Sequence, residues 1–585
     1  MANWQKADII GNMTVVFFGL FFVFLAWATF LLALAGIFYQ WLILILFFGG
    51  LSLLFILWRR NKISLAFSVE FVAIFIGIIL LILVFSYFIT PTIFSGRDQG
   101  SISEAAIRLS QNHQLDFSAP ASREFFKIYG PGKALNFPGF YYLADGKLIT
   151  QFPVPYIAWL AIFYSFFGLS GLAIANAVLL FIFSLSIYWL ARIFSGHFIS
   201  TLLLVLVITS FPVFWFFKFT LSENMALALV WLGILSLVLF LKKKNDFYFF
   251  STVAALGLLA FTRIEGFLML AMLIIILVLN KESRAFLASY KLKRIIFPLI
   301  FLAIVFLPEF FINFPFFKEM GKGIFSFFGN NIRSNEMPFA GKLVYNGKIF
   351  FIYGIIQYLV LGSWGVVYFL KRKEHLKLVP FILVSPIFFY LFDANISSDH
   401  PWMLRRFVFA VVPALIFYTS LFLFHWLNKE KKQLLFVIFS FLIIFNFTIF
   451  FKFAFFSENK GLLSQVQKLS LNFSKNDLVL VDRLSGGDGW AMISGPLSFL
   501  YGKQAVYFFN PDDLAKINLE KFDKIYLIVP EENVNFYQQS DLKNRMKFYR
   551  DYIFNTRRLD IGNSNTRLPG IITAEVKGKI FEIIP

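Results

Sequence analysis

Asp98 is the side chain that the sequence places most favourably for chemistry. It follows an apolar run that ends near position 90, and glycines lie on both sides of it. The S-x-x-E pattern of Ser101 and Glu104 predicts a capping box and a helix that starts near Ile102, so Asp98 would lie in the turn before that helix. The helix N-terminus would favour an ionised carboxylate, which can act as a general base or as a metal ligand. A solvated loop aspartate is the alternative, and the sequence does not separate the two.

Further ionisable side chains lie at the ends of later apolar runs. Such groups are costly at membrane depth and are often functional, but each also has a structural explanation. Glu223 could stabilise the N-terminus of a helix, and Arg263 could pair with Glu265 or extend to lipid headgroups. His400 could ligate a metal, although the five histidines show no ligand spacing. The candidate catalytic residues are Asp98 and Glu223, which would also be the ligands of a divalent metal, Mg²⁺ or Mn²⁺, and the candidate substrate-binding residues are Arg97, Glu104, Lys218, Arg263, His400, Arg405 and Arg406.

The composition is typical of a membrane protein. Hydrophobic residues occupy 59% of the 585 positions and charged residues only 15%, far from the balance of soluble domains. The chain has no cysteine, which excludes disulfides, thiolate chemistry and iron–sulfur clusters. It also has no P-loop, GxSxG or HExxH motif in a suitable context, so ATP-driven transport and zinc proteolysis have no support.

Apolar runs of membrane-spanning length predict about thirteen transmembrane helices. They cover residues 13–36, 40–58, 64–90, 172–193, 198–217, 223–242, 247–262, 264–280, 295–313, 346–370, 377–392, 406–427 and 433–454. Basic clusters fall in alternate connecting loops, and the positive-inside rule places all of them in the cytoplasm. These clusters are Arg59, Arg60 and Lys62; Lys242, Lys243 and Lys244; Lys281, Arg284, Lys291, Lys293 and Arg294; Lys371, Arg372 and Lys373; and Lys429, Lys431 and Lys432. The N-terminus is then inside a cytoplasmic membrane, and the loops 91–171, 314–345 and 393–405 and the tail 455–585 face outward.

The first outer loop has local patterns of its own. Asp145-Gly146 between two strand-like runs predicts a tight hairpin. Residues 155–168 are predicted to form a helix that lies on the outer surface, where Tyr156 and Trp159 would suit the headgroup layer.

The tail differs in composition from the rest of the chain. Three β-rich runs, at Asp477–Asp482, Ala505–Phe509 and Lys524–Pro530, alternate with helix-compatible polar stretches and predict a small α/β domain. Its charges nearly cancel, so we expect no nucleic-acid partner. The sequence therefore predicts a polytopic α-helical membrane protein in three parts: two N-terminal transmembrane helices in 1–63, a transmembrane core in 64–454, and an extracytoplasmic α/β domain in 455–585.

The order and predicted sidedness of several short motifs resemble those of a known family. The motifs are Gly96-Arg-Asp98 with Glu104-Ala-Ala, Pro155 to Leu160 (P-x-x-x-W-L), Ser222-Glu223, Arg263 to Gly266 (R-x-x-G) and Arg405 to Pro413 (R-R-F…P). Together they look like the GT-C glycosyltransferases, in the branch of the protein O-mannosyltransferases and lipid A aminoarabinose transferases. The resemblance covers about residues 64–430.

The resemblance implies a reaction and its participants. A sugar would pass from a polyprenyl phosphate or diphosphate donor to an acceptor at the outer membrane face, with inversion at the anomeric carbon. The loop acid would be the base or a metal ligand, and arginines would stabilise the leaving phosphate. Many relatives have Asp-Glu where this chain has Asp98-Gln99, which weakens the case for a metal. The acceptor, whether glycan, lipid or protein, does not follow from the sequence. A lipid-linked oligosaccharide flippase or other transporter, and a non-catalytic scaffold, are the alternatives.

Overall fold

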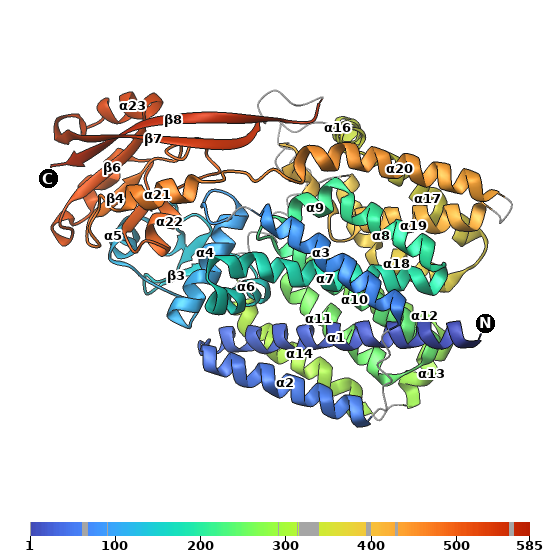
Figure 1. The fold of residues 1–585 in the computed structure, drawn as a ribbon. Helices are drawn as coiled ribbons and strands as arrows, with labels where there is room; N and C mark the ends of the chain where they lie inside the picture. The colour runs from blue at the N-terminus through green and yellow to red at the C-terminus, as the bar shows by residue number, and fades with distance from the viewer. Residues whose placement is uncertain are drawn as a thin grey trace.

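The computed structural model describes residues 2–60, 68–89, 92–289, 292–312, 314, 339–392, 399–427, 431–560 and 567–584. Figure 1 shows a bundle of long helices, a mixed segment that follows α3, and a C-terminal domain built on a sheet. Residues 315–338 and 393–398, which belong to two of the predicted outer loops, lie outside the described residues.

Each apolar run that the sequence predicts to span the membrane corresponds to a helix or to a pair of consecutive helices. The elements of the bundle are α1 (Ala2–Leu34), α2 (Gln40–Arg60), α3 (Val69–Tyr87), α7 (Leu169–Phe194), α8 (His197–Thr209), α9 (Phe211–Phe217), α10 (Ser222–Lys243), α11 (Asp246–Thr262), α12 (Glu265–Leu279), α13 (Lys281–Ser289), α14 (Leu292–Ile312), α16 (Phe339–Ile352), α17 (Ile356–Lys371), α18 (His375–Val384), η1 (Ser385–Leu391), η2 (Trp402–Phe407), α19 (Val411–Trp426) and α20 (Lys432–Phe453).

Five of the described helices are long and apolar enough to cross a membrane, or seven spans if two bent pairs each count as one. The pair α8–α9 bends by 58° and the pair α16–α17 by 106°, so residues 346–370 do not form the single straight span that the sequence predicts. The α16–α17 bend lies at Gly354, whose φ of +68° is in the left-handed region that favours glycine. The other predicted spans are apolar helices of 10–17 described residues, so the count of thirteen stays a prediction.

Helix α10 forms the centre of the bundle. Of its membrane-length window 94% is buried, against 22% for α3 and 28% for α20. A helix that is apolar on all sides and covered by other helices belongs to the core, whereas apolar helices left exposed indicate a surface that faces lipid. Helix α10 packs against α1, α7 and α11. Its first turn, which carries Glu223, is therefore fixed at the middle of one end of the bundle.

The segment between α3 and α7 connects the bundle to the C-terminal domain. Its elements are α4 (Asp98–Asn112), α5 (Pro120–Tyr129), β1 (Gly132–Lys133), β2 (Phe140–Tyr142), β3 (Leu148–Thr150) and α6 (Val154–Phe167). The predicted helix start near Ile102 is wrong, because α4 begins at Asp98. Ser101 is therefore inside the helix and donates to a backbone carbonyl of the following loop at 2.8 Å, while Glu104 accepts from a neighbouring arginine, so the two do not form a capping box.

The hairpin predicted at Asp145-Gly146 is confirmed, because β2 and β3 pair in antiparallel fashion on either side of it. The prediction of a surface helix with rings in the headgroup layer is wrong. In α6, Tyr156 and Trp159 are each only 1% exposed, since the helix packs against α1, α4 and α7. The Tyr156 hydroxyl donates to Asn176 at 2.7 Å and the Trp159 indole to the Ala175 carbonyl at 3.1 Å, so the polar atoms of both rings are satisfied inside the protein.

The C-terminal domain is the predicted α/β domain with one addition. Its elements are α21 (Leu462–Ser470), β4 (Leu478–Val481), α22 (Ser494–Phe499), β5 (Gln504–Tyr507), η4 (Pro511–Lys516), η5 (Leu519–Lys521), β6 (Ile525–Pro530), η6 (Glu531–Asn533), α23 (Val534–Gln538), η7 (Lys543–Arg545), β7 (Met546–Asp560) and β8 (Gly570–Ile583). The sheet order is β5-β4-β6-β8-β7, with β4 parallel to β5 and β6. The three predicted strands are confirmed, and the long antiparallel pair β7–β8 is new.

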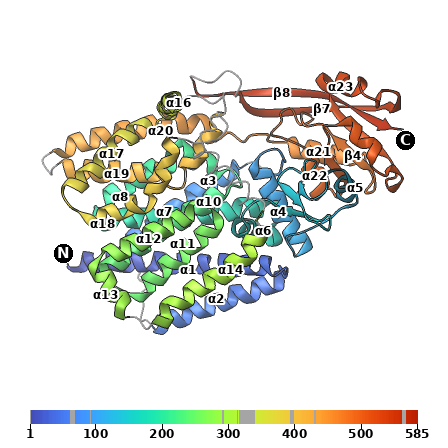
Figure 2. The same cartoon turned by 180° about the vertical axis from the view of Figure 1, so that it is seen from behind.

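The N-terminus and the C-terminal domain lie at opposite ends of the molecule in both views (Figures 1 and 2). Helix α13, which contains Lys281 and Arg284, lies at the same end as the N-terminus. The segment α4–α6 lies at the other end, next to the C-terminal domain. This arrangement agrees with the predicted separation of basic loops from large non-membrane segments.

Candidate active site

Glu223, in the first turn of the central helix α10, forms an ion pair with Arg263. The Nη1 atom of Arg263 lies 2.8 Å from Glu223 Oε1, and Arg405 Nε lies 3.9 Å from the same oxygen. The Arg263 Nη1 also donates to the Ser222 hydroxyl at 3.2 Å. Only 3% of the Glu223 side chain is exposed. Glu223, Arg263 and Arg405, which the sequence places at three span ends, are thus brought together.

Arg263 has a second carboxylate partner on its own loop. Its Nη2 and Nε donate to the two oxygens of Glu265 at 2.7 and 3.2 Å, a bidentate geometry that orients the guanidinium. Glu265 is also 3.5 Å from Arg406 Nη1 and accepts from the Tyr390 hydroxyl at 2.8 Å. The structural explanation of Arg263, pairing with Glu265, is therefore confirmed, and the same side chain also joins the Glu223 cluster.

The R-x-x-G motif fixes this geometry through its glycine. The chain turns sharply between α11 and α12, where the Gly266 amide donates to the Arg263 carbonyl at 2.9 Å. A Cβ atom at Gly266 would lie 2.5 Å from the backbone nitrogen of Ala260. Because this is a backbone atom, rotation of a side chain could not relieve the clash. A glycine is needed for α12 to start this close to the end of α11. The two termini then present Arg263 and Glu265 side by side.

Asp98, the first residue of α4, joins the cluster through Arg405. It forms an ion pair with Arg405, and 38% of its side chain is exposed. A Cβ atom at Gly100 would lie 1.8 Å from the Phe94 carbonyl, so the close turn into α4 requires this glycine. The ion pair uses Asp98 Oδ2, and among the described residues no donor reaches Oδ1. One oxygen of the carboxylate is therefore available as a proton acceptor.

Arg405 and Arg406 each keep an unused donor. The Nε atoms of both side chains are buried and have no hydrogen-bond partner among the described residues. Their positions are fixed by aromatic rings, since Arg405 lies 4.9 Å from the Trp402 ring centroid and Arg406 lies 5.4 Å from that of Tyr390. A buried donor without an acceptor is unfavourable, so this pair is suited to an anionic oxygen that arrives with a substrate.

Arg97 is held beside this cluster in an aromatic cage. Its guanidinium lies 4.4 Å from the Trp402 ring centroid and 4.2 Å from that of Trp490, and it pairs with Asp399. Trp490 comes from the C-terminal domain, so this contact joins the domain to the start of α4. The contact involves a main-chain bond as well, because the Met492 amide donates to the Ser95 carbonyl at 2.9 Å.

A small pocket of about 50 Å³ is lined by Trp402 and Trp490 together with Trp215. Its wall includes Arg97, Gln99 and Glu458, and the Gln99 Oε1 atom is buried there without a donor among the described residues. Burial, together with the nearby Asp488, raises the pKa of Glu458 to about 7. Sequence reasoning missed Glu458 and Trp490, because nothing in the pattern of the tail relates it to the loop that carries Asp98.

Three predicted substrate-binding residues lie apart from the cluster and make structural contacts. Glu104 accepts from Arg108 at 2.8 Å, and burial raises its pKa although this arginine opposes the shift. The Lys218 ammonium donates to the carbonyls of Phe453, Ala454 and Phe456 at 2.7–2.8 Å, which fixes the chain that leaves α20. His400 is buried and its Nδ1 lies 2.9 Å from the Tyr353 hydroxyl. None of these contacts includes Asp98 or Glu223.

The predicted metal ligands do not fit a divalent cation in this arrangement. Asp98 and Glu223 both face Arg405, and Glu223 also faces Arg263, so guanidinium groups occupy the space where a cation would bind. Within the described part of the chain, no group of three His, Asp or Glu side chains has ligand geometry. The metal stays a prediction without geometric support.

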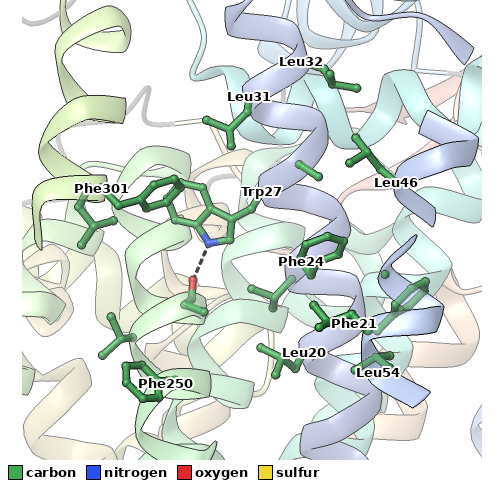
Figure 3. A pocket seen from close by; sticks show the side chains of 17 residues that line it. Leu20, Phe21, Phe24, Trp27, Leu31, Leu32, Leu46, Leu54, Phe250 and Phe301 are labelled. Atoms are coloured by element: carbon green, nitrogen blue, oxygen red, sulfur yellow. Dashed lines mark hydrogen bonds between the residues drawn. The ribbon is translucent and has the colours of Figure 1, made fainter. Parts of the chain in front are cut away.

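A larger cavity of about 750 Å³ lies elsewhere, between α1, α2, α11 and α14. Figure 3 shows its leucine and phenylalanine lining, with the Trp27 indole donating to the Ala254 carbonyl at 3.0 Å. All of its described lining residues are apolar or aromatic, with Gly50 beside them, and none is ionisable. The cavity therefore offers hydrophobic surface and no group for acid–base chemistry.

Comparison with known structures identifies the fold. A crystal structure of ArnT from Cupriavidus metallidurans bound to undecaprenyl phosphate superposes with a TM-score of 0.54, covering 88% of this chain and 98% of that one at 9% identity. The apo structure of the same protein gives a TM-score of 0.52, with 87% and 97% covered at 9% identity. The chain has the fold of these ArnT structures. No protein-family model and no curated protein matches the sequence. The shared fold includes the bundle and the C-terminal domain, since the match covers most of both chains. The resemblance read from the short motifs is thus confirmed at the level of the fold.

Proposed function

We propose that this protein is a glycosyltransferase that moves a sugar from a polyprenyl-phosphate donor to an acceptor hydroxyl. The observation that carries the proposal is the convergence of Asp98, Glu223, Arg263 and Arg405 at one end of the bundle, from four separate elements. The GT-C fold supports it, because a protein of that fold, ArnT, has been crystallised with undecaprenyl phosphate. A polyprenyl phosphate is the kind of donor that a cluster at the end of membrane helices can reach.

The chemistry follows from the two halves of the cluster. Asp98 Oδ1 takes the proton of the acceptor hydroxyl as its oxygen attacks the anomeric carbon. The bond between that carbon and the phosphate oxygen breaks on the opposite face, which inverts the configuration. The polyprenyl phosphate leaves with its full negative charge, and the guanidinium groups of Arg405 and Arg406, whose Nε atoms make no hydrogen bond with the described residues, stabilise it. Glu223 and Glu265 orient the arginines before the donor arrives.

The proposed side of the membrane is the outer one. The cluster lies at the end of the bundle that carries the C-terminal domain, and helix α13, with its basic residues Lys281 and Arg284, lies at the other end. The positive-inside rule assigns that basic end to the cytoplasm. The N-terminus would then be cytoplasmic and the active site and the C-terminal domain extracytoplasmic.

The test is transfer of radiolabelled sugar from synthetic polyprenyl-phosphate donors by the purified full-length protein. Asp98→Asn should abolish turnover, and Asp145→Asn, an exposed aspartate of the same outer segment, is the matched control. A flippase or a scaffold would move lipid or bind partners without cleaving the donor. Absence of any cleavage by the wild type across a panel of hexose, pentose and amino-sugar donors would reject the transferase.

A further inference from the structure

The C-terminal domain contains a pocket of its own at the carboxyl edge of its parallel strands. The pocket has a volume of about 540 Å³ and is lined by residues that directly follow β4, β5 and β6. Asp482 follows β4, Phe508 follows β5, and Asn533 lies in η6 after β6. In open α/β sheets, ligands bind in the crevice at this edge, and the volume lies within the usual range of about 300–1,000 Å³.

The wall of the pocket is aromatic and partly open to solvent. Trp490 is 40% exposed and Phe536 is 52% exposed, and the rings of Tyr507 and Phe509 lie 5.2 Å apart on another part of the lining. On the floor, Phe508 stacks on the buried ring of Tyr537 at 6.1 Å. Exposed flat rings around a fixed floor offer faces on which the apolar face of a ring-shaped ligand can pack.

Polar side chains are held in fixed orientations on the same floor. Asp482 accepts from Asn533 Nδ2 at 3.2 and 3.3 Å, from the Tyr537 hydroxyl at 2.9 Å and from the Leu484 amide at 2.8 Å. These bonds occupy both carboxylate oxygens and orient the amide of Asn533, whose Oδ1 receives no donor from the described residues. Arg483 lines the same pocket, and its guanidinium lies 5.2 Å from the Trp490 ring centroid. The pocket therefore presents an amide acceptor, Asn533 Oδ1, and the planar guanidinium of the exposed Arg483.

This combination favours one class of ligand. A lipid tail would leave the polar floor without partners, which is costly. A phosphorylated ligand would meet the carboxylate of Asp482, with Arg483 as the single cationic side chain among the described lining residues. A sugar satisfies both halves of the site, because its hydroxyls pair with planar amide and guanidinium groups while its ring packs on an aromatic face.

The pocket is continuous in structure with the region of Asp98. Trp490 belongs to the wall of this pocket and also covers Arg97, which precedes Asp98. The backbone of the Trp490 loop packs directly on the start of the catalytic segment, since a Cβ atom at Gly96 would lie 2.7 Å from the Gly489 carbonyl oxygen. Trp490 and its loop are therefore shared by the pocket and by the segment that carries Asp98.

We propose that this pocket binds a carbohydrate, and that it is the binding site of a glycan acceptor. The second part rests on the proposed transferase function, whereas the first does not. The pocket does not include Asp98, so the acceptor has to be longer than one sugar. Its distal sugars would occupy the pocket while its terminal hydroxyl reaches Asp98. The C-terminal domain then determines which acceptor is used.

The experiment measures the binding of a defined array of mono- to tetrasaccharides to the full-length protein in detergent. Wild-type protein should bind at least one oligosaccharide. Phe536→Ala and Asn533→Ala should each raise the Kd at least tenfold, because one removes a stacking face and the other an acceptor. Phe548→Ala, which removes a ring of similar exposure (53%) on β7, is the matched control and should bind like the wild type. Melting temperatures show whether each variant is folded.

The outcomes separate this inference from the proposed function. Asp98→Asn should lose transfer and keep glycan binding. Pocket-dependent binding with no transfer by the wild type would support the carbohydrate site and reject the transferase. Transfer with an acceptor KM that Phe536→Ala and Asn533→Ala leave unchanged would reject the pocket and keep the transferase. Failure of the wild type to bind any glycan of the array, or equal binding by the pocket variants, would also overturn the inference.

Discussion

Replacement of Asp98 by asparagine separates catalysis from stability. The substitution keeps the size of the side chain and removes the proton acceptor. Loss of a general base costs a factor of about 10²–10⁴ in rate, or about 2.7–5.5 kcal/mol of transition-state stabilisation. The Asp98 side chain is 38% exposed, and Arg405, which is only 12% exposed, still has Glu223 at 3.9 Å when Asp98 is replaced, so the loss of this ion pair should cost about 1 kcal/mol in folding. We expect a large loss of rate with an almost unchanged melting temperature.

The Asp98→Asn substitution should also change kcat and the donor KM in different ways. Asp98→Asn leaves Arg405 without its carboxylate partner, so the guanidinium is more available to a donor phosphate. The donor KM should therefore stay constant or fall while kcat falls. The assay is single-turnover transfer from a radiolabelled polyprenyl-phosphate sugar, with enzyme in excess, so that product release does not hide the chemical step.

Two results would refute this reasoning. Transfer by Asp98→Asn within a factor of three of wild type would remove Asp98 as the base. A melting temperature that falls as far as the activity does would show that Asp98 acts on the fold and not on the reaction. Asp145→Asn, run in parallel, controls for the loss of an exposed carboxylate near the membrane.

Four further predictions follow from the described contacts. Arg405→Lys should raise the donor KM at least tenfold, because lysine cannot reproduce a planar donor pair, and steady-state kinetics will show it. Glu223→Gln should destabilise the protein by about 3–5 kcal/mol in thermal unfolding, because it leaves buried guanidinium groups without their carboxylate, and unchanged stability would contradict the buried network. Burial alone would raise the pKa of Glu124, but hydrogen bonds from two lysines and a backbone amide lower it from 4.5 to about 2, so the melting-temperature advantage over Glu124→Gln should be complete above pH 5 and shrink as pH falls from 4.5 toward 2. In the cysteine-free chain, cysteine at Ser540 should react with an impermeant reagent from outside and cysteine at Asn245 should not, and labelling of both from one side would reject the topology.

The sequence predicts what depends on local patterns and on order along the chain. Apolar runs of sufficient length can only be helices in lipid, because the backbone must satisfy its own hydrogen bonds there, so the helical segments are found correctly. The parallel strands of the tail are likewise apparent from short β-rich runs between polar stretches. The motif residues Asp98, Glu223, Arg263 and Arg405 do converge, since each lies at a span end predicted to be on one side.

The errors arise where tertiary contacts override a local signal. Ser101 and Glu104 match a capping box, but the close packing of Gly100 against the preceding chain starts α4 at Asp98 instead. Tyr156 has the amphipathic ring typical of an interface helix, yet its hydroxyl finds a buried amide in α7. No local pattern could predict that the tail places Trp490 over the loop before Asp98, because the two are nearly 400 positions apart.

Arg405 and Arg406 explain how the proposed base, Asp98, and the site of the donor phosphate can lie next to each other. Before the donor binds, Asp98, Glu223 and Glu265 balance Arg263, Arg405 and Arg406, so the buried cluster carries no net charge. A donor phosphate adds negative charge next to Arg405 and competes with Asp98 for the same guanidinium. Binding of the donor would then weaken the Asp98–Arg405 pair and release the carboxylate from its cationic partner, at the moment when an acceptor proton has to be removed. On this argument Arg405 couples donor binding to activation of the base. Arg405→Lys should therefore lower kcat as well as raise the donor KM, whereas a residue that only binds phosphate would change the KM alone.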